Sequence, residues 1–294
     1  MAINKSMRRV LKALSFDGIE VEASRHLANL KAIDPMKIFH KTIDYKIYNG
    51  NHQIPVRIFL PGEKMEDDLP VFLFFHGGGW VTKSIDNYER ICARLASATD
   101  HIVVSVEYRL APEHPYPAAV EDAMRAWDYL MYQGYGAENV TVAGDSAGGN
   151  LALVLCRRLK AAGRRMPRAL LLMSPWTDMT MSGASYRERV ESDPMLTPEY
   201  IEAVRRAYAG DRDLQDPDLS PLLGDLGSFP PTLIQVGDHE ILYSDSASLA
   251  AALRAAHVPC RLEVSEGMWH VFQMFPIKKA AAAMESAARF LLEL

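Results

Sequence analysis

A serine stands where the sequence changes from an expected strand to an expected helix. Ser146 lies in the run Gly144-Asp145-Ser146-Ala147-Gly148-Gly149, after the apolar residues 139–143 and before the helix-like residues 150–155. The pattern G-x-S-x-G between a strand and a helix is typical of a sharp turn that exposes a nucleophilic serine. Glycine is needed there because the turn is strained and larger side chains would collide. We therefore predict that the chain makes and breaks acyl–oxygen bonds.

A nucleophilic serine needs a base, and the base needs a carboxylate to orient it. On a fold with this turn, the acid and then the histidine follow the serine along the chain. His270 follows the last expected strand and precedes the last expected helix, so we predict that it is the general base. Asp238 and Glu240 follow the preceding expected strand, 231–236. Either carboxylate can orient an imidazole, so these residues alone leave both as candidates for the acid.

A run of glycines follows the first buried strand. The sequence His76-Gly77-Gly78-Gly79-Trp80 is the type of loop whose backbone N–H groups face a developing oxyanion. Consecutive glycines allow the backbone to approach a substrate closely. We expect His76 to hold this loop by hydrogen bonding and to transfer no proton.

The elements that position these groups alternate along the chain. Apolar runs without polar alternation predict strands that are buried on both faces, and helical segments separate them. Two alternating segments before them predict an antiparallel hairpin at one sheet edge, turning at residues 49–51. We thus expect an eight-stranded, mostly parallel sheet with helices on both faces, its strands being 42–48, 54–60, 71–75, 102–106, 140–143, 169–173, 232–236 and 260–264.

The alternation is interrupted once. Residues 176–220 are irregular and helical, without a convincing strand, and residues 1–40 have a helical pattern. We predict that residues 1–40 form N-terminal cap helices and that residues 41–294 form the catalytic domain, with a cap insertion at about 176–220.

The composition excludes several classes of partner. A net charge of −5 and a pI near 6.0 do not favour nucleic acid, and no apolar run is long enough for stable membrane insertion. The basic N-terminal residues 1–16 lack the features of a signal peptide, and the three cysteines have no metal-binding or redox spacing. His239 and Glu240 are followed by Tyr243 where a zinc-binding H-E-x-x-H motif requires histidine. We expect a cytoplasmic protein without a bound metal.

Taken together, the motifs resemble those of the bacterial hormone-sensitive-lipase family of carboxylesterases, also called family IV, which have the α/β-hydrolase fold with a helical cap. The similarity spans about residue 54 to the C-terminus. Its motifs are HGGGW at 76–80, YRLAPE at 108–113 with Pro117-Ala118-Ala119, GDSAGGNLA at 144–152, Ser174-Pro175-Trp176, and Gly267-Met268-x-His270.

The resemblance implies a role for each matching position. Ser146 would be the nucleophile, His270 the base, and the backbone N–H groups of Gly78, Gly79 and Ala147 the oxyanion donors. The family's acid, usually aspartate, lies about thirty residues before the histidine, which here favours Glu240 and leaves Asp238 as the alternative. A second departure is Val271, where the family commonly has glycine.

These assignments lead to a hypothesis about activity. We expect a serine carboxylesterase that hydrolyses short- to medium-chain acyl esters through an acyl-enzyme, without a cofactor and with a homodimer as a possible assembly. Trp80, Tyr186, Met195 and Tyr208 are the expected substrate contacts, although packing inside the cap is the simpler explanation for Tyr186, Met195 and Tyr208. The same triad is compatible with hydrolysis of a lactone, an amide or a sugar acetate. A non-catalytic small-molecule receptor is the alternative outside the enzymes.

Overall fold

The computed structural model describes residue 11 and residues 41–62 and 69–294. The predicted N-terminal cap helices of residues 1–40 therefore lie outside the described residues, except for the buried Leu11.

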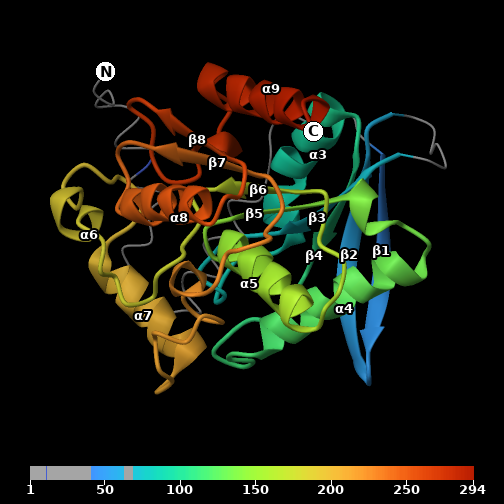
Figure 1. The fold of residues 1–294 in the computed structure, drawn as a ribbon, viewed down its shortest axis with the longest axis horizontal. Helices are drawn as coiled ribbons and strands as arrows, with labels where there is room; N and C mark the ends of the chain where they lie inside the picture. Colours follow the sequence, from blue (N-terminus) through green and yellow to red (C-terminus); the bar gives the residue numbers. More distant parts are fainter. Residues whose placement is uncertain (1–10, 12–40, 63–68) are drawn as a thin grey trace.

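One sheet organises the described part of the chain, and it has the eight strands that the sequence predicts (Figure 1). The strand order is β1-β2-β4-β3-β5-β6-β7-β8. β1 and β2 form the expected edge hairpin and β2 pairs antiparallel with β4, whereas all the other neighbours pair in parallel. The strands are β1 (Lys41–Asn49), β2 (His52–Leu60), β3 (Val71–Phe75), β4 (Ile102–Val106), β5 (Val140–Asp145), β6 (Ala169–Met173), β7 (Thr232–Gly237) and β8 (Cys260–Ser265).

Helices cover both faces of the sheet. α3 (Glu89–Thr99) and α9 (Lys278–Leu292) pack on one face. α4 (Ala118–Tyr132), α5 (Ala147–Ala161) and α8 (Tyr243–Ala255) pack on the other face. Figure 1 shows α3 and α9 on the side of the sheet away from α4, α5 and α8. This arrangement confirms the predicted fold class.

Burial on both faces explains why the central strands lack polar alternation. Phe72 and Phe74 of β3 point toward α3 and α9. Leu73 and Phe75 point into the opposite core, and all four side chains are fully buried. The edge strand β1 is mostly exposed by contrast, and of its alternating apolar residues Ile47 is buried while Ile43 and Tyr45 are exposed.

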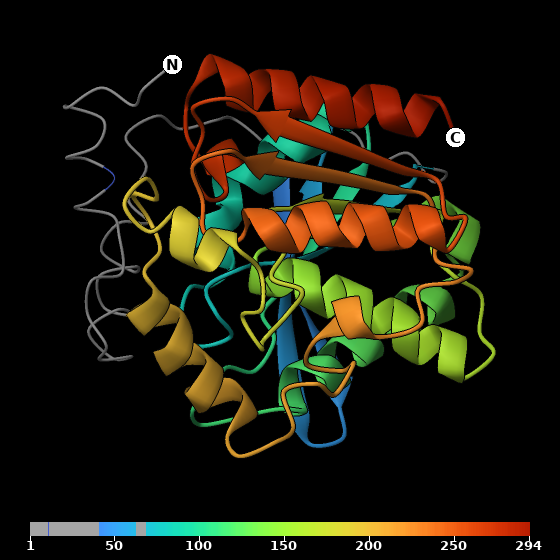
Figure 2. The same cartoon turned by 60° about the vertical axis from the view of Figure 1, so that its left-hand side comes forward.

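Two helices occupy the predicted insertion. α6 (Ser185–Glu188) and α7 (Pro198–Ala209) lie between β6 and β7, and the described residues of this interval contain no strand. α7 begins where the Thr197 hydroxyl accepts a hydrogen bond from the Tyr200 N–H at 3.2 Å, with Pro198 at the first helical position. Figure 2 shows both helices on the side toward which the arrows of β7 and β8 point. The insertion therefore lies at the carboxyl edge of the parallel strands.

Candidate active site

The candidate residues gather at this carboxyl edge because each follows a different parallel strand. His76 and its glycines follow β3, and Ser146 follows β5. Glu240 follows β7 and His270 follows β8. Parallel strands end at one edge of a sheet, which is where ligands bind in open α/β folds.

Ser146 occupies a strained turn between β5 and α5. Its backbone φ of 52° and ψ of −118° lie in a region that residues other than glycine rarely adopt. A Cβ atom at Gly148 would lie 2.0 Å from the Phe75 carbonyl oxygen, and one at Gly144 would lie 2.3 Å from the Gly148 carbonyl oxygen. The two glycines are therefore sterically required, as the sequence predicts. Ala147 is the first residue of α5, so its N–H lies at the positive end of the helix dipole.

His270 and Glu240 form a buried pair. The Nδ1 atom of His270 lies 2.8 Å from Oε2 of Glu240. The Glu240 side chain is fully buried and that of His270 is 8 % exposed. A carboxylate in this position fixes the orientation and tautomer of an imidazole and stabilises its protonated form.

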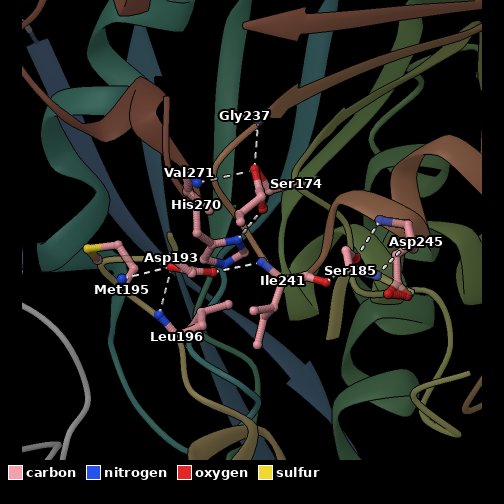
Figure 3. A network of polar contacts seen from close by, with 12 residues as sticks. Ser174, Ser185, Asp193, Met195, Leu196, Gly237, Ile241, Asp245, His270 and Val271 are labelled. Atoms are coloured by element: carbon pink, nitrogen blue, oxygen red, sulfur yellow. Dashed lines mark hydrogen bonds and ion pairs between the residues drawn. The ribbon is translucent and has the colours of Figure 1, made fainter. Parts of the chain in front are cut away.

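The second carboxylate oxygen of Glu240 is held by two further donors. Oε1 accepts hydrogen bonds from the Ser174 hydroxyl at 2.8 Å and from the Gly237 N–H at 2.7 Å. Ser174 in turn accepts from the Val271 N–H at 3.2 Å, as Figure 3 shows. Ser174 thus links the acid to the residue after the histidine. The sequence singled out Ser174 only as part of a motif, without assigning it this role.

Asp238 has different partners. Its Oδ1 lies 2.6 Å from Nδ1 of His239 and accepts a hydrogen bond from the Gly267 N–H at 2.6 Å. The Arg189 guanidinium binds its backbone oxygen. Asp238 therefore joins the acid loop to the loop that carries the histidine, while Glu240 contacts the imidazole itself.

The glycine loop after β3 is held by a buried polar network. The Gly77 N–H donates to the Tyr88 hydroxyl and to Oδ1 of Asp145, each at 2.9 Å. The Tyr88 hydroxyl donates to Oδ2 of Asp145 at 2.8 Å. Burial raises the pKa of Asp145 above its ordinary value. Since Asp145 directly precedes Ser146, one side chain ties the Ser146 turn to the predicted oxyanion loop.

His76 lies in this loop without access to solvent. Its ring stacks on Tyr108 with 4.3 Å between ring centroids, and its Nδ1 lies 2.8 Å from the Gly77 carbonyl oxygen. Burial lowers the pKa of His76 to about 4, so the ring is neutral at neutral pH. These contacts fit the structural role predicted from the sequence.

The four predicted substrate contacts are all largely buried. Trp80 stacks on Tyr208 of α7 with ring centroids 4.2 Å apart, and the Tyr186 hydroxyl donates to Asp245 at 2.7 Å. Met195 is 9 % exposed. Trp80 and Tyr208 thus join the predicted oxyanion loop to the insertion, and Tyr186 of α6 joins the insertion to α8 through Asp245. Their role as substrate contacts stays a prediction.

Two further residues of the motifs, Arg109 and Asn150, make hydrogen bonds away from the predicted triad. Arg109 donates from its Nε atom and its backbone N–H to Oδ2 of the buried Asp122, each at 2.9 Å. Asn150 of α5 donates from one amide nitrogen to the carbonyl oxygens of Trp176 and Leu219, each at 2.9 Å. The sequence assigned a role to neither side chain. The partner of Arg109 lies on α4, and the partners of Asn150 lie 26 and 69 residues later in the chain.

The described residues contain no cluster of three or more histidine, cysteine, aspartate or glutamate side chains that is suited to a metal ion. Within residues 41–62 and 69–294 we also find no helix with the length and apolar composition that crossing a membrane requires.

Comparison with known proteins gives the family. A family model described as "alpha/beta hydrolase fold" matches residues 72–274. The chain belongs to this family. Among solved structures, it is similar to an esterase from the bacterial hormone-sensitive lipase family, with a TM-score of 0.91 and 32% identity over 100% of this chain and 99% of that one. This confirms the resemblance expected from the motifs.

Two curated relatives of this alpha/beta hydrolase are named as an acetyl-hydrolase and a carboxylesterase. It is 36% identical to an acetyl-hydrolase of Streptomyces hygroscopicus over 76% of each chain. It is 34% identical to the carboxylesterase NlhH of Mycobacterium tuberculosis over 91% of this chain and 86% of that one.

Proposed function

We propose that this alpha/beta hydrolase is a serine carboxylesterase that works through an acyl-enzyme intermediate. The observation that carries the proposal is the buried His270–Glu240 pair, 2.8 Å apart, at the edge where the strained Ser146 turn projects. The esterase and carboxylesterase names of its relatives support ester hydrolysis as the reaction class.

In the first half-reaction, Ser146 Oγ attacks the ester carbonyl carbon while His270 accepts the hydroxyl proton. Glu240 stabilises the imidazolium that forms. The negative charge on the carbonyl oxygen is met by the backbone N–H groups of Gly78, Gly79 and Ala147. His270 then gives the proton to the leaving alcohol, and the acyl group remains on Ser146.

In the second half-reaction, water replaces the alcohol. His270 takes a proton from the water, and the resulting hydroxyl attacks the acyl carbon. Collapse of the second tetrahedral intermediate breaks the bond to Ser146 Oγ, which recovers its proton from His270. The carboxylic acid leaves and the enzyme is restored.

The proposed substrates are esters of short- to medium-chain acids. A relative named acetyl-hydrolase supports the short end of this range. The aromatic stack of Trp80 and Tyr208 fills space beside the glycine loop, which also favours a small acyl group. The proposal requires no cofactor, since the triad and backbone donors supply the acid–base and electrostatic steps.

The test is turnover of p-nitrophenyl esters from acetyl to dodecanoyl by the wild-type chain and by Ser146→Ala. We expect kcat/KM to peak at short acyl chains and to be lost in the variant. Thermal unfolding of both proteins checks that the variant is folded. Equal turnover by the two proteins would exclude Ser146 as the nucleophile. A folded wild-type enzyme without turnover on any of these esters would overturn the esterase proposal.

A further inference from the structure

Asp193 is a carboxylate of the insertion that reaches the acid loop. Its Oδ1 accepts hydrogen bonds from the N–H groups of Met195 and Leu196, at 2.8 and 3.0 Å. Its Oδ2 accepts from the N–H of Ile241 at 2.8 Å, a residue 48 positions later in the chain. Figure 3 shows the Asp193 carboxylate beside His270, with these three donors around it.

The Ile241 backbone is held at both of its polar groups by the insertion. While Asp193 accepts its N–H, the Ser185 hydroxyl donates to its carbonyl oxygen at 2.5 Å. Ile241 directly follows Glu240, so these bonds fix the backbone from which the triad carboxylate extends. A displacement of about 1 Å in a catalytic group lowers the rate by roughly 10²-fold.

Asp193 also contributes charge at the site. Burial raises its pKa to about 6, while the backbone donors and the positive form of His270 act in the opposite direction. Other charged groups face the same region. Glu240 contacts the His270 ring, and the Asp145 carboxylate attracts the positive form of His270. The Arg189 carbonyl oxygen accepts a hydrogen bond from the Asp193 N–H, and the Arg189 guanidinium carbon lies 3.6 Å from the centroid of the Tyr243 ring. Above pH 6, Asp193 adds a further negative charge near the imidazole that must become positive during turnover.

We propose that Asp193 is a positioning residue that fixes the Glu240 loop through Ile241 and stabilises the protonated form of His270. This inference rests on the proposed function, because it assigns Asp193 a part in the same triad. The insertion would then determine the turnover rate as well as the shape of the substrate site.

The test compares Asp193→Asn and Asp193→Ala with a matched control, Asp178→Asn. The Asp178 carboxylate lies in the same insertion, and its hydrogen bonds among the described residues stay within its own loop, to the N–H and hydroxyl groups of Thr180 and Ser182. On p-nitrophenyl butyrate we expect both Asp193 variants to lose about 10- to 100-fold in kcat with a smaller change in KM. We expect Asp178→Asn to stay within threefold of wild type.

The pH profile separates this role from general loosening of the cap. Removal of the Asp193 charge should move the acid limb of kcat/KM to lower pH in Asp193→Asn, whereas Asp178→Asn should leave the limb in place. Amide hydrogen exchange should also show weaker protection of the Ile241 N–H in this variant, which tests the link even if activity is too low to measure.

Two outcomes would overturn the proposal. One is a kcat within twofold of wild type in Asp193→Asn. The other is an equal loss in Asp193→Asn and Asp178→Asn with an unmoved acid limb. The proposed function fails separately, through retained activity in Ser146→Ala or a wild type that is inactive on every ester.

Discussion

Substitution of Gly78 by alanine tests the predicted oxyanion loop most directly. Gly78 has a φ of +108°, far from the left-handed well near +57° that other residues visit, so alanine is strained there. Its Cβ would lie 2.3 Å from the Thr82 carbonyl oxygen, and that backbone atom cannot rotate away as a side chain would. The loop must therefore shift, and its N–H groups shift with it.

The expected size of the effect follows from the geometry of the donors. Oxyanion donors act at about 2.7–3.1 Å from the charged oxygen, and losing one costs roughly 10²–10³ in kcat, or about 2.7–4 kcal/mol. We expect Gly78→Ala to lose kcat in this range on p-nitrophenyl butyrate. The change in KM should be much smaller, because the charge develops only in the transition state.

Gly50→Ala is the matched control. Gly50 also has a positive φ, +59°, but nothing lies within 4 Å of its added Cβ, and it is in the turn between β1 and β2. It should lower the free energy of unfolding by about 1 kcal/mol and leave kcat unchanged. A folded Gly78→Ala enzyme with kcat within threefold of wild type would refute the reasoning.

Three further predictions concern the acid, the cap and the buried histidine. Glu240→Gln should lose roughly 10²–10⁴ in kcat, and Asp238→Asn less than about tenfold, in steady-state assays; the reverse order would make Asp238 the acid. Tyr208→Leu removes the ring stacked beside the glycine loop and should lower the free energy of unfolding by at least about 0.5–1.5 kcal/mol in urea titrations, whereas Tyr132→Leu, at an 87% exposed position, should change it little. The pKa of His76 is lowered to about 4 in the folded protein, so as pH falls the unfolded chain binds the proton before the folded chain does. The free energy of unfolding should therefore fall by up to about 3 kcal/mol between about pH 6.5 and pH 4. His76→Gln should flatten this dependence, and an unchanged slope would contradict the assignment.

Much of the fold was predictable because its signals are local. The apolar runs identify every central strand, and the glycines around Ser146 identify a turn that the structure shows to be sterically obligatory. The swap that places β4 between β2 and β3 was not predicted, because strand order depends on how the crossover helices pack.

The contacts around the predicted acid show what local sequence patterns could not predict. The family resemblance favoured Glu240 over Asp238, whereas the residues themselves left both open, since both follow β7 and differ only in their side-chain contacts. Asp193 caps a local turn through the N–H groups of Met195 and Leu196, but its contact with Ile241, 48 residues later, depends on the fold. Val271 also departs from expectation, since this β-branched residue has a left-handed φ of 48°. The strain is visible only in the folded backbone.

The amide of Asn150 has a consequence for how the insertion is attached to the rest of the protein. By binding the carbonyl oxygens of Trp176 and Leu219, it fastens together the two ends of the insertion, one helical turn after Ser146. The separation of those ends is then independent of what lies between them. Residues between those ends contact the rest of the protein, as Tyr208 does at Trp80 and Asp193 does at Ile241, so a fixed pair of ends helps to keep these contacts in register. The Asn150 amide is thus a shared anchor for both ends of the insertion, and its loss should be felt at Trp176 and Leu219 together.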